Sequence, residues 1–333
     1  MASIKEIAKE ANVSPATVSK ALNQRKDISE ATRQRIIRIA ESHDFVPSSL
    51  GRNLKNQRTE NIGVIFCRES QPLSANPFYS RVLEGIEAEL AMNNYNLVLH
   101  LLPNDYTGTL PKMLREGQVD GVILAGVLRP DFIQRLRNLS VGAVLVDPKI
   151  VINDFSQILI DNEHGAFQAV EHLIRCGHKR IGFISGNLDR LSFIERFKGY
   201  KKALQYYKIE FEQELVQSGG LEQGYEHTRK LIQMDNPPTA IFAANDINAI
   251  YGYKAVKDSG LRIPEDISVI GFDDIELAKI SSPPLSTIRV YKEEMGSIAV
   301  RILLQIINNE LGKPVITLVP TKLVERESVG YVK

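Results

Sequence analysis

The sequence contains very little cysteine and no tryptophan. Its two cysteines, Cys67 and Cys176, stand far apart and form no CxxC pair. Two thiols without ligand-like spacing indicate neither a disulfide framework nor a zinc site, so we expect no bound metal. Both side chains are expected to be small buried hydrophobes.

Long apolar runs are also missing. No stretch of 18 apolar residues occurs, and residues 1–10 carry acidic side chains where a signal peptide would have an apolar run. These absences argue against a membrane-spanning or exported protein. We therefore expect a cytoplasmic protein with no membrane partner.

The motifs of several common enzyme classes are absent as well. The chain has no GxGxxG after a strand, no P-loop, no GxSxG elbow and no HExxH helix. Its six histidines show no metal-ligand spacing. The sequence therefore predicts a protein that is not an enzyme, with no catalytic residue and no cofactor.

Charge is nearly balanced over the whole chain but not along it. The 333 residues leave room for a large core and more than one domain, with a net charge of +1. Residues 1–60 hold 11 Lys and Arg against 7 Asp and Glu, whereas the remainder holds 30 against 33. A basic head on a mildly acidic body is typical of a phosphate-binding segment on a ligand-binding domain, although a charged helical face gives the same count.

Residues 4–23 show two short amphipathic helical patterns in succession. Ser3 and Glu6 form a capping box before the first helix. Ser14 is the expected N-cap of the second, with Pro15 at its first helical position. The outer face of the second helix is small and hydroxyl-rich with one cation, which suits entry into a DNA major groove, although an ordinary helical pair has the same pattern.

Three motifs in the first 58 residues carry a family resemblance: VSPATVSKALN, ISEATRQRI and FVPSSLGRNLK. In this order they resemble the head and hinge of the lactose-repressor (LacI/GalR) family of bacterial transcription regulators. The resemblance implies a three-helix helix-turn-helix head, with its third helix opening at Ser29. Base reading would rest on Pro15, Ala16 and Lys20. The residues expected to contact DNA are Ile4, Ser14, Pro15, Ala16, Thr17, Ser19, Lys20, Asn23 and Leu54.

Residues 47–60 match the family's hinge. In the family this segment becomes helical on the operator, pairs with its copy across the dimer, and wedges a leucine into the minor groove; Leu54 is the matching residue. This chain has Gly51 where the family usually has alanine. Because glycine in a helix costs about 1 kcal/mol relative to alanine, we expect the hinge to order less readily.

From residue 61 onward, short apolar runs alternate with segments of helical period. The runs are NIGVIF, NLVLHLL, DGVILAG, GAVLVD, QILID, RIGFISG, TAIFAAND and ISVIGFDD, and helices are expected at residues 79–92, 163–176, 193–207 and 246–259. Buried strands alternating with helices indicate a doubly wound parallel α/β fold. Eight runs exceed one sheet, so two subdomains are expected, and the resemblance implies a two-lobed, periplasmic-binding-protein-like effector domain.

The expected domain limits follow from this reading. They are 1–46 for the head, 47–60 for the hinge helix and linker, and 61–333 for the core, with lobe 1 at about 61–161 plus 290–320 and lobe 2 at about 162–289 plus 321–333. No leucine heptad tail follows Glu325. We therefore expect no tetramer-forming tail like that of the lactose repressor, and we expect a homodimer.

Polar residues directly after the apolar runs are the candidates for a ligand site, because ligands collect at the carboxyl ends of parallel strands. The resemblance assigns effector contacts to Phe78, Tyr79, Asp147, Arg190, Arg196, Asn245 and Asp273. Carboxylates, an amide and guanidinium groups around aromatic rings suit a polyol. Where the family often has an aromatic residue in the second lobe, this chain has Gly219 or Leu221, which leaves a wider pocket or one less able to stack.

Some of these polar residues have structural alternatives. Asp161 and Asp246 are expected to cap the helices that follow them. Asn245 and Asp274 have the alternative role of fixing loops. His178 resembles a turn position of the family, for which we expect a structural role.

The resemblance implies a sugar-responsive transcription regulator, a repressor of carbohydrate-utilisation genes. As a homodimer it would bind a pseudo-palindromic operator in double-stranded DNA. An effector that closes the lobes would change hinge geometry and therefore operator affinity. The alternatives are a catabolite-control regulator with a phosphorylated protein corepressor, and a sugar-binding receptor without a regulatory role.

Overall fold

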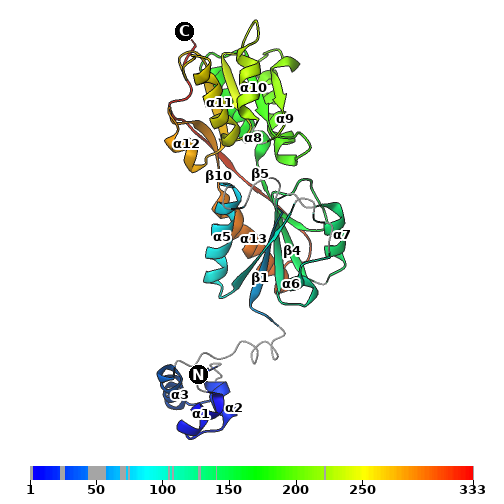
Figure 1. Cartoon of the computed structure of the whole chain (residues 1–333). Coiled ribbons are helices and arrows are strands. Elements are labelled where there is room, and N and C mark those ends of the chain that lie inside the picture. Colours follow the sequence, from blue (N-terminus) through cyan, green and yellow to red (C-terminus); the bar gives the residue numbers. More distant parts are fainter. Residues whose placement is uncertain are drawn as a thin grey trace. The chain divides into compact units, whose positions relative to one another are not determined.

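The computed structural model describes residues 3–22, 27–43, 58–67, 73, 76–103, 106, 109–126, 129–139, 141–220 and 223–332 (Figure 1). The chain divides into two compact units, residues 1–59 and residues 60–333. We call them the head and the body. The expected hinge helix, with Gly51 and Leu54, lies outside the described residues, as does Asn23.

The head contains three short helices: α1 (Ile4–Glu10), α2 (Pro15–Leu22) and α3 (Glu30–Ser42). Their apolar faces enclose a core of Ile7, Ala8, Ala11, Val18, Ala21, Ile36 and Ala40. The Ser3 capping box before α1 is present as predicted. Ser14 caps α2 and Ser29 caps α3, each accepting a hydrogen bond from a backbone amide three residues later. The predicted starts of all three helices are therefore confirmed.

The body contains two six-stranded sheets. The first has the strand order β11-β5-β4-β3-β1-β2 and the second β12-β10-β9-β8-β6-β7. Neighbouring strands are parallel except β10 and β12. The strands are β1 (Asn61–Cys67), β2 (Asn96–Leu102), β3 (Gly121–Ala125), β4 (Gly142–Val146), β5 (Ser156–Ile160), β6 (Ile181–Ser185), β7 (Val216–Ser218), β8 (Ala240–Ala243), β9 (Ser268–Asp273), β10 (Ser286–Val290), β11 (Ile316–Val319) and β12 (Thr321–Val324).

Helices cover both sheets. They are α5 (Tyr79–Met92), α6 (Lys112–Arg115), α7 (Pro130–Arg137), α8 (Asn162–Arg175), α9 (Leu191–Tyr206), α10 (Gly224–Ile232), α11 (Asp246–Asp258), α12 (Glu276–Ile280) and α13 (Lys292–Ile307), with the 3-10 turn η2 at Gln213–Leu215. The predicted doubly wound, two-lobed fold is confirmed. We call the lobe with the first sheet lobe 1 and the other lobe 2. Among the described residues, no helix has the length and hydropathy needed to cross a bilayer.

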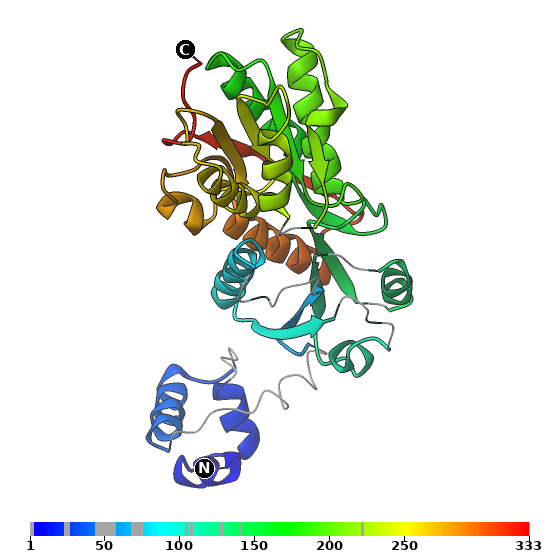
Figure 2. The ribbon, with the colours of Figure 1, turned by 45° about the horizontal axis from the view of Figure 1, so that its top comes forward.

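The chain passes between the lobes after β5, after β10 and after β11. After β10 it enters α13, which lies beside α5 in lobe 1 (Figure 2). The two helices meet backbone to backbone, since a Cβ on Gly85 would lie 1.9 Å from the carbonyl oxygen of Glu293. The last two strands then complete one sheet each, β11 the first and β12 the second.

Three single-residue expectations have mixed outcomes. Cys176 is buried as predicted, but Cys67 is only half-buried because it ends β1 at the sheet margin. The structural role of His178 is confirmed. Its buried ring hydrogen-bonds to the hydroxyl of Thr239 at 2.9 Å and to the carbonyl of Gly330 at 3.0 Å, which ties the C-terminal segment to lobe 2.

Candidate functional site

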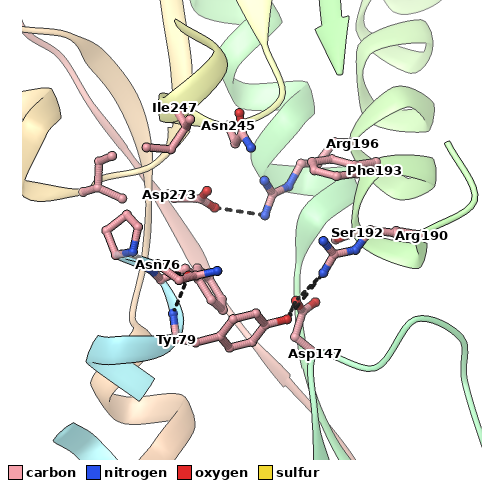
Figure 3. Close-up of a pocket in the computed structure, with 13 residues that line it drawn as sticks. Asn76, Tyr79, Asp147, Arg190, Ser192, Phe193, Arg196, Asn245, Ile247 and Asp273 are labelled. Atoms are coloured by element: carbon pink, nitrogen blue, oxygen red, sulfur yellow. Dashed lines mark hydrogen bonds and ion pairs between the residues drawn. The ribbon is translucent and has the colours of Figure 1, made fainter. Parts of the chain in front are cut away.

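The seven residues expected to contact an effector all line one pocket of the body (Figure 3). The pocket is open to solvent on one side, and its cavity volume is about 80 Å³. Both lobes contribute to it. Its lining residues are Asn76, Pro77, Phe78, Tyr79, Asp147, Arg190, Ser192, Phe193, Arg196, Asn245, Ile247, Asp273 and Ile275.

One side of the pocket is a polar contact between the lobes. Tyr79 begins α5 and Asp147 follows β4, both in lobe 1, and the Tyr79 hydroxyl donates to Asp147 Oδ2 at 2.9 Å. Arg190 precedes α9 in lobe 2 and points toward both (Figure 3). Its Nη2 lies 3.9 Å from the same carboxylate oxygen and 3.4 Å from the Tyr79 hydroxyl. These three side chains therefore join the two lobes at the pocket.

The other side of the pocket is an ion pair within lobe 2. Arg196 Nη2 lies 3.1 Å from Asp273 Oδ1, and the two side chains are only 4% and 13% exposed. The guanidinium also donates to Asn162 Oδ1 at 2.9 Å and to the carbonyl of Ala244 at 2.5 Å. It stacks 3.7 Å above the ring centroid of Phe272. Protein contacts therefore hold the Arg196 guanidinium in place.

The two pocket carboxylates lie on unusual backbone. Asp147 has φ 48° and Asp273 has φ 113°, and Asp274 follows with φ 52°. Positive φ is uncommon for residues other than glycine, and such conformations persist where the surroundings enforce them, often at functional sites. The turns after β4 and β9 thus place the carboxylates at the carboxyl ends of their strands.

The pocket combines opposite charges in equal number. Its charged lining residues are Asp147, Asp273, Arg190 and Arg196. Burial raises the pKa of both carboxyl groups, and the neighbouring guanidinium groups oppose that rise by favouring the ionised form. Each guanidinium group faces a carboxyl group, so the pocket offers hydrogen-bond donors and acceptors side by side to a polar ligand.

Asn245 and Asp246 follow β8, and Asn245 has the helix-capping role that was predicted for Asp246. Asn245 lines the pocket and is itself the N-cap of α11, so the predicted cap at Asp246 is wrong. The extended backbone of Asn245 places the helix start one residue earlier. Asp246 is fully buried, accepting from the Ile275 amide at 2.9 Å and the Thr287 hydroxyl at 2.6 Å. Burial, and then the charge of Asp273, raise its pKa to about 8.

Hydrogen bonds show which structural roles Asp161 and Asp274 have. Asp161 caps α8 by accepting from the His164 amide at 3.3 Å, as predicted. Asp274 does fix structure, because its carboxylate accepts from Arg289 and from Arg326 at 2.6 Å each. Neither carboxylate lines the pocket.

Six lining residues are not among the seven predicted effector contacts. They are Asn76, Pro77, Ser192, Phe193, Ile247 and Ile275. Ile247 and Ile275 each stand two positions after a predicted strand-end residue, so extending those segments by two residues would have included them. Phe193 follows Arg190 by about one helical turn at the start of α9. Residues three positions apart lie on the same side of a helix, so helical periodicity would have predicted it.

In the head, α2 presents the outer face that the sequence predicts. Pro15 and Ala16 are exposed, and Thr17 is half-exposed. The Ser14 hydroxyl accepts from the Thr17 amide at 3.1 Å and lies 2.9 Å from its hydroxyl, which fixes the first turn. Ser19 is half-exposed farther along the same helix. Small side chains on this face allow close approach to a DNA surface.

Two predicted DNA contacts have neighbours that the sequence did not suggest. Ile4 packs partly into the head core. Lys20 Nζ forms an ion pair with Asp27 Oδ2 at 2.7 Å, in which both side chains are more than half exposed. An exposed pair of this kind is worth about 0–1 kcal/mol, so Lys20 can exchange Asp27 for a DNA acceptor at little cost.

Comparisons with known proteins agree with this architecture. Residues 3–48 match bacterial regulatory proteins of the lacI family, and residues 170–329 match a periplasmic binding protein-like domain. The HTH-type transcriptional repressor PurR of Vibrio atlanticus (strain LGP32) is 33% identical over 342 residues, which cover 99% of each chain.

Two solved structures resemble the whole chain. The Lac repressor dimer bound to operator and the anti-inducer ONPF has a TM-score of 0.85 at 26% identity, covering 99% of both chains. The transcriptional regulator CelR in complex with cellobiose has a TM-score of 0.74 at 31% identity, covering 98% of this chain and 100% of the other. The family predicted from the motifs is thus confirmed, and α1 and α2 form its helix-turn-helix. The chain belongs to the lacI family of bacterial regulatory proteins and is a DNA-binding transcription regulator.

Proposed function

We propose that this chain is a homodimeric repressor of carbohydrate-utilisation genes whose operator affinity is set by a neutral sugar in the body pocket. The observation that carries the proposal is the pocket itself, with two arginine–aspartate pairs and aromatic rings beside them. CelR, which resembles this chain over nearly its full length, is solved in complex with cellobiose, a neutral sugar.

The pocket chemistry supports a polyol in particular. Asp147 and Asp273 can accept hydrogen bonds from hydroxyl groups, while Arg190 and Arg196 can donate to them. Phe78 offers an apolar ring to the C–H face of a sugar. A phosphate or carboxylate on the ligand would introduce a charge that no lining residue balances, so neutral sugars should bind more tightly than sugar phosphates.

Regulation would act through the contact between the lobes. Arg190 of lobe 2 reaches Asp147 and Tyr79 of lobe 1, so a ligand inserted among them changes how the lobes meet. An effector that binds one lobe arrangement better shifts the population toward it, and operator DNA must change effector affinity by the same factor. The Lac repressor relative is a dimer on its operator, which supports two heads on a pseudo-palindromic site.

We propose no enzymatic reaction in the pocket. The protein would bind chromosomal DNA in the bacterial cytoplasm. A phosphorylated protein corepressor is the alternative controlling partner. Its contact would lie on the outer surface and would not depend on Arg190, so the two modes respond differently to an Arg190→Gln variant.

The proposal is tested by selecting duplexes from a random-sequence library with the purified full chain and measuring affinity for the recovered sequence by fluorescence anisotropy. Titrations with D-ribose, cellobiose and glucose 6-phosphate should give a change in affinity for a neutral sugar, with a smaller change for the phosphate. Arg190→Gln should keep DNA binding and lose the sugar response. Recovery of no sequence, or an affinity that no sugar changes, would contradict the proposal.

A further inference from the structure

Asn162 contacts one of the pocket arginines without lining the pocket itself. It is the first residue of α8, where the chain enters lobe 2 after β5, and it is 3% exposed. Its Oδ1 accepts from Nε of Arg196 at 2.9 Å. Its Nδ2 donates to the carbonyl of Ile160 at 3.3 Å and to Oε2 of Glu195 at 3.2 Å. Both polar atoms of this buried side chain therefore have protein partners.

The chemistry of these partners permits only one orientation of the Asn162 amide. A guanidinium group only donates, so Arg196 must face the amide oxygen. A backbone carbonyl and an ionised carboxylate only accept, so Ile160 and Glu195 must face the amide nitrogen. The reversed amide would turn N–H groups toward the Arg196 donor and an oxygen toward two acceptors. The two bonds made by Nδ2 therefore aim the amide oxygen at Arg196.

The backbone around Asn162 is closely packed. Helices α8 and α9 meet here, since a Cβ on Gly199 would lie 2.2 Å from the carbonyl oxygen of Glu163. Ile160 is the last residue of β5 in lobe 1, and Arg196 belongs to α9 in lobe 2. Asn162 bonds to both. It therefore ties the arginine to the point where the chain crosses between the lobes.

The bond to Asn162 determines how the Arg196 guanidinium faces the pocket. Nη1 donates to the carbonyl of Ala244, and Nη2 faces Asp273 (Figure 3). With the Nε bond, these contacts with described residues use three of the five N–H groups of the guanidinium, and two remain for a ligand. Because the group is planar and rigid, a bond at Nε fixes the direction in which the remaining N–H groups point.

We propose that Asn162 is a positioning residue for effector binding, which holds the Arg196 guanidinium so that its remaining N–H groups donate to hydroxyl groups of a sugar. The inference rests on the proposed sugar-binding function. Asparagine is specific to this role, because aspartate would keep the acceptor but lose both donations, and leucine would lose all three bonds. Neither substitution removes a residue that lines the pocket.

The first test is calorimetric titration of the full chain with cellobiose and with D-ribose. Asn162→Leu is similar in shape to the native residue and removes the acceptor. It should weaken binding of a sugar that the native chain binds by about tenfold, the usual effect of losing one buried hydrogen bond. The double variant Asn162→Asp with Glu195→Gln keeps an oxygen for Arg196 and places a donor beside it, so its affinity should return to within about threefold of the native value.

Two further variants complete the series. His164→Leu changes an exposed side chain in the same turn of α8 and should leave sugar binding unchanged. Glu195→Leu removes one of the two anchors of the amide nitrogen, so it should weaken binding in the same direction but by less than Asn162→Leu. It takes the place of Asn162→Leu if that variant does not fold.

The second test needs no sugar. In the full chain with isotope-labelled arginine, the Nε–H resonance of Arg196 is assigned by its loss in Arg196→Lys, and exchange of this proton with water is measured by NMR. Exchange should be slow in the native chain and in the double variant. It should be about tenfold faster in Asn162→Leu, because the N–H group has lost its buried acceptor.

The outcomes separate the positioning role from the proposed function. If a sugar binds, and Asn162→Leu lowers stability in urea but keeps native affinity where it is folded, Asn162 is merely structural and the inference is overturned. It is also overturned if the double variant binds no better than Asn162→Leu. If neither sugar binds the native chain, the sugar-binding function fails. Equal Nε–H exchange in the native chain and Asn162→Leu would then overturn the positioning role too, whereas faster exchange in the variant would support it.

Discussion

The head and the body pocket hold their functional side chains in opposite ways. In the head, six of the residues predicted to contact DNA come from one continuous segment, residues 14–20, and four of these six are exposed. In the body, the pocket residues come from loops and helices of both lobes, and several are buried. A surface that is local and exposed can change without affecting the fold, whereas a site assembled from buried groups is also part of the core.

The charge pairs of the two regions show the same contrast. Lys20 and Asp27 of the head are 53% and 56% exposed, whereas Arg196 and Asp273 of the pocket are 4% and 13% exposed. An exposed pair contributes about 0–1 kcal/mol to stability, while removing one partner of a buried pair costs about 3–5 kcal/mol. Function and stability should therefore be separable in the head and coupled in the pocket.

The largest effect is expected for Arg196→Ala. It leaves Asp273 buried without its ion pair, and it removes the hydrogen bonds to Asn162 and Ala244. We expect the free energy of unfolding of the body to fall by about 3–5 kcal/mol, measured by urea denaturation. Lys202→Ala on the same helix is the control, since its pair with Glu163 is exposed. If both variants lost the same free energy of unfolding, the buried ion pair would stabilise the body no more than the exposed one.

The next effect is a pH dependence from Asp246. Its pKa is raised to about 8 from an ordinary 3.8, so between these values the folded state binds a proton that the unfolded state has released. Stability therefore falls as pH rises through this range, by up to about 1.4 kcal/mol per pH unit. Asp246→Asn should remove that part of the slope, measured by urea denaturation at pH 5, 6, 7 and 8.

The control for Asp246 is at the other end of the same helix. Asp258→Asn removes an exposed carboxyl whose pKa is lowered by Lys254, so it should leave the slope between pH 5 and 8 unchanged. Identical slopes in the native chain and Asp246→Asn would mean that Asp246 is ionised when folded.

Most of the fold could be predicted because its signals are local. The helix predicted at residues 79–92 is α5, and the run NLVLHLL is β2. Strands β7, β10, β11 and β12 lie outside the eight apolar runs. β7 has only three residues, and β10 includes the polar residues Thr287 and Arg289, which find partners only in the folded structure.

The seven predicted effector residues all line the pocket, although Arg190 and Arg196 belong to the start and the interior of α9 and were named from the family resemblance. Asp147 and Asp273 follow apolar runs, and their family positions were recognisable. The exchange of roles between Asn245 and Asp246 was not predictable, because it depends on a single backbone torsion at the helix start. The close contact of α10 with α11 at Gly224 depends on how the two helices pack, which no motif encodes.

In the head, Lys20→Ala should affect DNA binding alone. Lys20 is exposed and its pair with Asp27 is weak, so the free energy of unfolding should change by less than about 1 kcal/mol. Affinity for the selected duplex should fall by about 1–3 kcal/mol, and its salt dependence should change if Lys20 contacts phosphate. Lys9→Ala on α1 is the matched control. An unchanged affinity in Lys20→Ala would mean that α2 reads DNA without its one cation.

The smallest effect is expected for Asp27→Asn. The substitution removes a negative charge beside Lys20 and releases its ammonium group for DNA acceptors. Affinity should rise by less than about 1 kcal/mol, because the exposed pair is weak. A double-variant cycle with Lys20→Ala separates the two routes, since any gain that persists without Lys20 must come from reduced repulsion of the DNA phosphates. A loss of affinity would mean instead that Asp27 positions Lys20 for reading, and the head would then depend on a fixed charge pair as the pocket does.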